Sequence, residues 1–138
     1  MKKRSAFFAA VVLALCLAAC GENIGEVTID YGKSDIYTKS DMDAAIERIE
    51  NAFSAWEGCE LHSIRYTSDE CNSEENIAWM NDLGGENAEL TQCITFVSDF
   101  HSPKTNAGAW NPDEEYTNWQ WWLARTENGE WRLMTWGY

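Results

Sequence analysis

The feature that most constrains the fold of this chain is a pair of aromatic-rich segments, residues 116–125 and 130–138, on either side of Asn128-Gly129. Both segments alternate bulky apolar side chains with polar ones, a pattern typical of β-strands. An Asn-Gly pair between two such segments is a strong hairpin signal, because both residues tolerate the positive φ angles of tight turns. We therefore expect an antiparallel hairpin to close the chain.

Charges on the two strands select the register of this hairpin. A two-residue turn would set Glu127 opposite Glu130. The same turn would set Arg125 opposite Arg132, and like charges that face each other across strands are destabilising. A three-residue loop with a left-handed Gly129 avoids both pairings. It places on one sheet face Trp119, Trp121, Leu123, Trp131 and Leu133, and on the other Gln120, Trp122, Ala124, Arg132, Met134, Trp136 and Tyr138.

Residues 38–58 carry the pattern of an amphipathic helix. Thr38 precedes Asp41 by three residues, as in a capping box, and Gly58 follows the last periodic residue, where helices often end. Apolar side chains recur at steps of three and four: Met42, Ala45, Ile46, Ile49, Phe53 and Trp56. We expect a long first helix here, with one buried face.

The middle of the chain predicts two strands around a short helix. Residues 59–67 form the first strand, with a bulge near His62 or Ser63 where the apolar alternation changes phase. Ser73 caps the short helix, which runs through Leu83 and turns three side chains inward: Ile77, Met80 and Leu83. Residues 90–101 form the second strand, and a polar connection, residues 102–115, leads to the hairpin.

The first twenty residues carry a targeting pattern. Three basic residues, an apolar run over 6–15 and Leu17-Ala18-Ala19-Cys20 resemble the signal of bacterial lipoproteins. The resemblance implies that residues 1–19 are removed as a signal peptide and that the Cys20 thiol carries a diacylglycerol. We then expect residues 20–37 to be a tether, and we leave open whether residues 27–31 add an edge strand to the sheet. We expect the protein to lie on the extracytoplasmic face of the cell membrane.

The charge balance excludes one class of partner. The full chain has 10 basic and 23 acidic residues, a net charge of −13. Removing residues 1–19 leaves seven basic residues against the same 23 acids, which gives −16. Nucleic-acid binding draws on clustered Lys and Arg, which this chain lacks after residue 4. An anionic membrane surface would also repel the domain, so we expect the lipid alone to provide attachment.

Three cysteines, Cys59, Cys71 and Cys93, remain after the targeting segment. An exported chain can form a disulfide, and Cys59 with Cys93 is the expected pair if one forms. The alternative is that all three are small buried side chains. Their spacing is too wide for a zinc site, and we expect no metal or other cofactor.

The expected order of elements is a helix, a strand, a short helix and three more strands. This order predicts an α+β domain over residues 38–138, with about four antiparallel strands in a curved sheet. The hairpin shows the rhythm Trp121-Trp122-Leu123, Gly129, Trp131-Arg132-Leu133. In this the chain resembles cystatin-like and nuclear-transport-factor-like cone folds, and small lipoproteins of Gram-positive bacteria. Cone folds serve enzymes, ligand pockets and interaction modules, so the resemblance implies no single activity.

No catalytic motif stands out. His62 and His101 are the only histidines, and no Ser or Cys lies in a nucleophile motif. Asp99 and His101 have the spacing of a base and its orienter, although a surface pair is the expected outcome. Asp113-Glu114-Glu115 lacks the alternating ligands of a calcium loop. The Q-x-V-x-G loop of cystatin inhibitors is absent, and no protease inhibition is expected.

The tryptophans point to binding. Their number on the hairpin predicts an aromatic patch on the sheet face that the helix leaves open, and such patches mark recognition surfaces. The predicted binding residues are Gln120, Trp122, Arg132, Trp136 and Tyr138. The alternative is that the loop carrying Trp110 covers this patch as a second small core.

We therefore expect a non-enzymatic, lipid-anchored domain, monomer or homodimer, that binds a small molecule, glycan, peptide or protein. A cone-fold enzyme, an isomerase or hydrolase acting on a small hydrophobic substrate, is the first alternative. A structural dimer that buries the aromatic face is the second.

Overall fold

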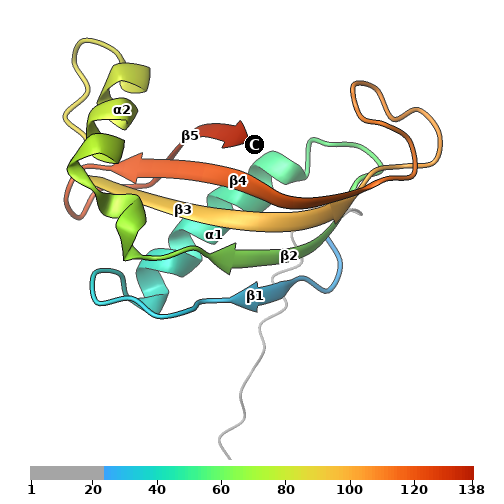
Figure 1. The fold of residues 1–138 in the computed structure, drawn as a ribbon, viewed down its shortest axis with the longest axis horizontal. Coiled ribbons are helices and arrows are strands. Elements are labelled where there is room, and N and C mark those ends of the chain that lie inside the picture. Colours follow the sequence, from blue (N-terminus) through green and yellow to red (C-terminus); the bar gives the residue numbers. More distant parts are fainter. Residues whose placement is uncertain (1–23) are drawn as a thin grey trace, which may run out of the picture.

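A computed structural model describes residues 24–138 of the chain, so the expected signal peptide and Cys20 lie outside the described residues. The described part is an α+β domain with one sheet and two α-helices (Figure 1). The α+β class predicted from the sequence is confirmed. In chain order the elements are β1 (Thr28–Asp30), α1 (Lys39–Phe53), β2 (Glu60–Tyr66), the 3-10 helix η1 (Asp69–Asn72), α2 (Glu74–Gly84), β3 (Gln92–His101), β4 (Glu115–Arg125) and β5 (Arg132–Gly137).

The sheet has five strands in the order β1-β2-β3-β4-β5 and is mixed. β2 to β5 are antiparallel neighbours, whereas β1 pairs with β2 in parallel. The expectation of about four antiparallel strands is wrong on this point. The chain leaves β1, passes through α1 and returns as β2, and a helical crossover of this kind places its two strands in parallel.

β1 lies inside residues 20–37, which the sequence analysis assigned mainly to a tether. Four side chains before α1 pack against the main core: Ile24, Val27, Ile29 and Tyr31. Tyr37 is buried, and its hydroxyl donates to the Cys93 carbonyl at 2.6 Å. The packed part of the chain therefore begins before residue 38, and Ile24 already belongs to it.

α1 begins at the capping box expected from Thr38. The Thr38 hydroxyl accepts from the Asp41 amide, and the Asp41 carboxylate accepts from the Thr38 amide. The expected apolar stripe is buried against the sheet: Met42, Ala45, Ile46, Ile49 and Phe53. The helix ends at Phe53, and residues 54–58 turn before β2. Trp56, the last residue of the stripe, stacks on Trp121 of β4 at 5.2 Å between ring centroids.

α2 packs on the opposite side of the sheet from α1, around a second, smaller core (Figure 1). Ser73 caps it, as predicted, and Met80 is fully buried. Leu83 was expected to face inward but is exposed. Gly84 approaches the second core instead, since a Cβ added there would lie 2.7 Å from Ala88, 3.4 Å from Leu90 and 3.7 Å from Met134. The second core contains Met80, Leu90, Cys93 and Ala124, with Ile77, Ala88, Trp122 and Met134 around it.

The hairpin has the predicted register next to its loop, where Ala124 pairs with Arg132 and Leu123 with Leu133. Two details differ. Asn128, with φ 58°, is left-handed, and Gly129 is not. The pairing also shifts by one residue between Leu123 and Trp122, so that Trp121 pairs with Trp136.

This bulge moves two predicted binding residues to the other sheet face, because one extra residue reverses the alternation of side chains beyond it. Trp136 lies beside Trp121, and the Tyr138 ring lies 5.1 Å from Trp119, both on the α1 side. The face expected to combine Trp122, Trp136 and Tyr138 is therefore not formed. The bulge expected near His62 or Ser63 is confirmed in β2.

The turn before β2 leads to a stability prediction. Gly58 has φ 77°, and a Cβ there would lie 2.9 Å from the Pro103 Cβ. Gly108 has φ 61° but open space around it. We expect Gly108→Ala to lower the free energy of unfolding by about 1 kcal/mol, from backbone strain alone. Gly58→Ala should lower it further, because the contact with Pro103 adds to that strain. Urea denaturation of both variants measures the difference, and equal losses would contradict the role assigned to Pro103.

Candidate functional site

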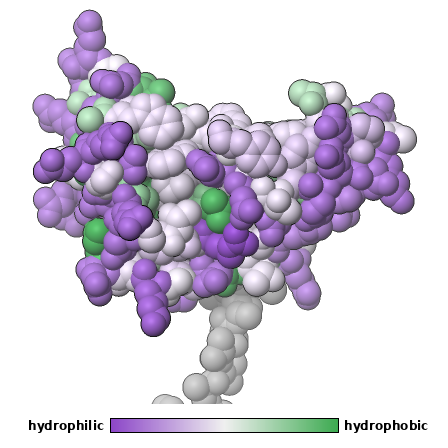
Figure 2. Space-filling view, viewed as in Figure 1, coloured by the Kyte–Doolittle hydropathy of each residue, from purple (hydrophilic) through white to green (hydrophobic). Residues whose placement is uncertain are grey.

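The sheet face opposite α1 carries the residues able to meet a ligand. We call it the open face; α2 covers only one end of it. Figure 2 shows hydrophilic residues at both ends of this face and, between them, mostly paler side chains around a small hydrophilic group. The register of β2, β3 and β4 aligns its outward side chains: Arg65, Thr95, Val97, Asp99, His101, Asn118, Gln120 and Trp122.

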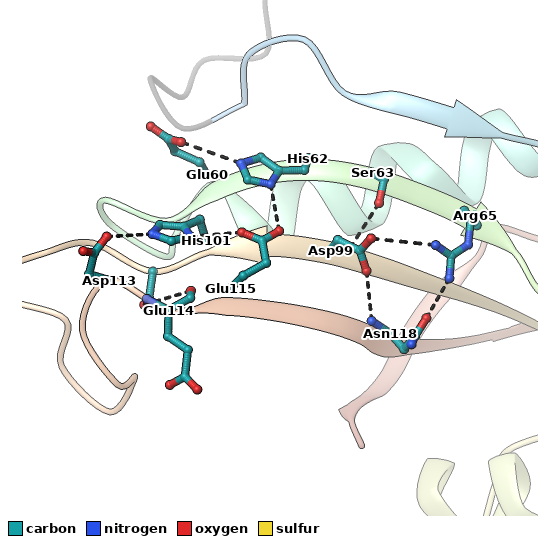
Figure 3. Close-up of polar contacts among 11 residues, drawn as sticks. Glu60, His62, Ser63, Arg65, Asp99, His101, Asp113, Glu114, Glu115 and Asn118 are labelled. Atoms are coloured by element: carbon teal, nitrogen blue, oxygen red, sulfur yellow. Dashed lines mark hydrogen bonds and ion pairs between the residues drawn. The ribbon is translucent and has the colours of Figure 1, made fainter.

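The end of the open face next to residues 102–114 holds a cluster of two histidines and their carboxylates (Figure 3). The Glu115 carboxylate bridges the two rings, with Oε1 2.9 Å from His62 Nδ1 and Oε2 2.9 Å from His101 Nδ1. Asp113 Oδ1 lies 2.8 Å from His101 Nε2. Glu60 is the remaining acid, 3.7 Å from His62 Nε2. Each ring therefore already has carboxylate partners.

The contacts of His101 favour its imidazolium form. Both of its ring nitrogens face carboxylate oxygens, which only accept, so both hydrogen bonds can form at once only when both nitrogens carry protons. The hydrogen bonds to Asp113 and Glu115 raise the pKa of His101 above its usual 6.5. The same contact with His101 lowers the pKa of Asp113. This cluster ties β2, β3 and β4 to the 102–114 connection.

The middle of the open face is a second closed set of polar contacts. Asp99 lies 3.8 Å from Arg65 and accepts from the backbone N–H of Asn118 at 3.0 Å. Arg65 also donates to the Asn118 side chain at 2.7 Å. Asp99 is thus paired with Arg65 and Asn118, while His101 is paired with Asp113 and Glu115. The base-and-orienter arrangement of Asp99 and His101 is not formed.

The end of the open face next to η1 and α2 contains a cleft of about 310 Å³. Polar side chains and one indole dominate its lining, which includes a single carboxylate and no Lys or Arg. The lining residues are Thr67, Ser68, Glu70, Cys71, Asn76, Thr95, Val97, Gln120 and Trp122. We call this the α2 cleft.

Thr95, on the central strand β3, is the unusual member of the α2 cleft. It is only 4% exposed, and its hydroxyl oxygen has no hydrogen-bond partner among the described residues. A contact of the Thr95 side chain with the neighbouring Cys93 thiol lowers the pKa of that thiol against the larger effect of burial, but it does not have hydrogen-bond geometry. Buried hydroxyls are nearly always hydrogen-bonded, so an unsatisfied one in a cleft wall indicates a partner that arrives from outside the chain.

Gln120 and Trp122 complete the cleft wall beside Thr95. Trp122 Nε1 donates to Gln120 Oε1 at 3.0 Å, which fixes the indole and leaves the Gln120 amide group as a donor. The Trp79 ring of α2 packs on Trp122 at 4.9 Å, nearly perpendicular to it. The alternative cover, Trp110, lies elsewhere, against Trp56 and the aromatic residues of the α1 side.

The five predicted binding residues do not lie at one site in the structure. Gln120 and Trp122 line the α2 cleft, whereas Arg132, Trp136 and Tyr138 do not. Trp136 is 49% exposed and Tyr138 76%, at the α1 side of the sheet. Sequence reasoning missed the cleft residues that come from β3, η1 and α2. The alternation of β3 could have indicated Thr95 and Val97, but nothing local places η1 beside them.

Cys59 and Cys93 do not form the expected disulfide. Cys59 belongs to the core under α1 and Cys93 to the core under α2, so the sheet separates them. All three cysteines are free and buried, as the alternative interpretation expected. Burial raises the pKa of the Cys93 thiol to about 12 and raises that of Cys59, which disfavours the reactive thiolates.

Within residues 24–138, no group of three or more His, Cys, Asp or Glu side chains is arranged to hold a metal ion. None of the helices in that part of the chain is long and apolar enough to cross a membrane. Comparison of the chain with protein-family models, curated proteins and solved structures gives no match. Its function is therefore inferred from the geometry of the open face.

Thr95 provides the first prediction for this site. We expect Thr95→Val to raise the free energy of unfolding by about 1 kcal/mol, because it removes an unsatisfied buried hydroxyl and keeps the shape of the side chain. Thr67→Val is the matched control. The Thr67 hydroxyl donates to the Thr95 carbonyl at 3.0 Å, so its loss should lower stability by about 1 kcal/mol. Urea denaturation compares the two, and a destabilised Thr95→Val protein would contradict the assignment.

His101 provides a prediction for pH dependence. Because its folded pKa is raised, its stabilising contribution is complete below pH 6.5 and is lost as the pH rises through the folded pKa. Asp113, with a lowered pKa, contributes above pH 3.8 and loses its contribution as the pH falls through its folded value. Proton NMR should show His101 titrating above pH 6.5. Asp113→Asn should lower that midpoint, and an unchanged midpoint would show that the contact is not made in solution.

Proposed function

We propose that this chain is a lipid-anchored, extracytoplasmic binding domain whose ligand lies in the α2 cleft. One observation carries the proposal: the buried Thr95 hydroxyl, without a hydrogen-bond partner, lies in a cleft wall with the Trp122 indole and the Gln120 amide. Small-molecule sites combine an apolar surface with a few polar groups that fix orientation. Its volume of about 310 Å³ lies at the small end of such sites.

The lining of the cleft favours binding over catalysis. Glu70 is its one carboxylate and Cys71 its one thiol, and no histidine lies in the lining to activate a Ser or Thr hydroxyl. Burial raises the pKa of the Cys71 thiol, which opposes formation of the thiolate that would attack a substrate. Both histidines of the chain lie at the other end of the open face, where carboxylates occupy them. The cleft therefore lacks a paired base and nucleophile.

The lipid anchor is proposed from the signal-like residues 1–20 and the short distance to the folded part. Ile24 already packs against the core, only four residues after Cys20. Four extended residues span at most about 14 Å, so an anchored domain would stay close to the headgroups. With a net charge of −16 after residue 19, the domain itself would not be drawn to anionic lipid.

A cystatin-like or nuclear-transport-factor-like cone is our proposal for the finer description of the fold. Its support is one helix, α1, packed along one face of four consecutive antiparallel strands, β2 to β5. β1 and α2 are then additions to that arrangement. The α2 cleft lies on the outer side of the sheet, opposite the surface that a cone encloses.

The binding proposal is tested by mapping ligands with amide NMR shifts on the unlipidated domain. The probes are neutral methyl glycosides, free amino acids, short peptides and choline. We expect at least one probe to shift the amides of Thr95, Val97 and Gln120. The polar groove between α1 and the hairpin, which includes Ser40, Arg48 and Glu130, is the internal control. Shifts confined to that groove, or none with any probe, would overturn the proposed site.

The anchor is tested with the full chain in a bacterial host that processes lipoproteins. The unaltered chain should partition into detergent, and its mass should match a diacylglyceryl protein that begins at Cys20. Cys20→Ser should partition into the aqueous phase, while Cys59→Ser, at a buried cysteine, should leave the anchor intact. An unaltered chain that keeps its first residues and stays aqueous would contradict the proposal.

A further inference from the structure

We infer that the ligand of the α2 cleft is a neutral carbohydrate, bound with a sugar ring against Trp122. This inference rests on the proposed function and names its ligand class. It is carried by the combination of an oriented indole, several uncharged hydrogen-bonding groups and a buried hydroxyl without a partner.

Trp122 provides the apolar surface. A pyranose ring presents a patch of C–H groups on one face, and an indole matches such a patch in size and offers it a negative π-surface. The hydrogen bond to Gln120 and the edge contact with Trp79 hold the Trp122 ring in one orientation. A ring fixed in this way loses little conformational freedom when a ligand packs on it.

The polar groups of the cleft suit hydroxyl groups that both donate and accept. Thr95 and Ser68 offer hydroxyls, and the Gln120 amide offers donors because its oxygen already accepts from Trp122. Asn76 uses its amide group to donate to the Cys71 carbonyl at 3.2 Å, so its oxygen remains an acceptor. The Glu70 carboxylate adds two more acceptor atoms. A sugar hydroxyl within reach of Thr95 would satisfy this buried group; among residues 24–138 the other buried polar atom without a partner is Trp119 Nε1, on the α1 side.

Three other ligand classes fit these groups less well. An anion would meet Glu70 with no Lys or Arg in the lining to balance it. A quaternary ammonium group would pack on the indole but cannot itself hydrogen-bond, and a ligand such as choline brings only one hydroxyl to the several polar groups of the cleft. An extended peptide gains its affinity by adding to a sheet edge, whereas the cleft lies over β3 and β4, whose backbone groups are already paired on both sides.

The test is saturation-transfer NMR and calorimetry on the domain, with a panel of neutral methyl glycosides and trisaccharides. Glucuronate, choline and a tripeptide are the comparison ligands. We expect a neutral sugar to bind and the comparison ligands not to bind at equal concentration. Trp122→Ala should weaken the sugar affinity at least about tenfold, as expected for a central aromatic contact. Trp136→Ala is the matched control, an exposed tryptophan outside the cleft, and should leave the affinity unchanged.

Thr95→Val keeps the inference testable if Trp122→Ala fails to fold. This variant keeps the shape of the side chain, and we expect it to weaken sugar binding by about fivefold to tenfold. Sugar binding that Thr95→Val leaves unchanged would overturn the inference. Binding of choline, glucuronate or the tripeptide in the α2 cleft, without any neutral sugar, would overturn it while leaving the proposed binding function intact. No binding by any probe would remove both.

Discussion

The arrangement of the whole domain depends on the burial of Trp121 between the sheet and α1. This side chain is the largest fully buried one among residues 24–138. Its indole N–H donates to the Ser98 hydroxyl at 2.9 Å, and its ring stacks on Trp56. The hydrogen bond and the ring contact both hold the side chain on the α1 side. Fixing Trp121 on that side fixes the alternation of β4. Gln120 and Trp122, its neighbours in sequence, must then point to the opposite side of the sheet.

The opposite side is incompletely covered because α2 is short. Its 11 residues bury Met80 and support Trp122 through Trp79, but they do not extend over Val97, Asp99 or His101. The α2 cleft forms where this cover stops, between η1 and the sheet. A longer or more centrally placed helix would bury Trp122 and close the cleft. The candidate site thus lies where the part of the sheet covered by α2 meets the part that α2 leaves uncovered.

Much of the fold follows from local patterns in the sequence. The capping box at Thr38, the apolar stripe of α1 and the bulge in β2 are all visible in spacing alone, because each depends on residues close together in the chain. The loop register follows from the charges that a shorter turn would oppose. Two features could not be read in this way. The parallel pairing of β1 depends on a partner 35 residues away, and the bulge in β5 depends on packing across the sheet.

The bulge in β5 explains why the site could be predicted only in part. A single extra residue moved Trp136 and Tyr138 to the α1 side, so the residues predicted to share one binding face lie on both faces of the sheet. Thr95 was on the expected strand face, yet its importance comes from a missing partner, and a sequence shows which groups need hydrogen bonds without showing which receive them.

Along the open face, some polar side chains already have hydrogen-bond or ion-pair partners within the chain and others do not. This difference indicates the candidate site more clearly than the residue types alone. At one end the histidines are already paired with carboxylates, and in the middle Asp99 is already paired with Arg65. A ligand there would have to replace contacts that already exist. At the α2 end, Thr95 is buried without a partner, so a ligand adds a hydrogen bond and displaces none. These contacts are why we propose binding at the end with the fewest charges.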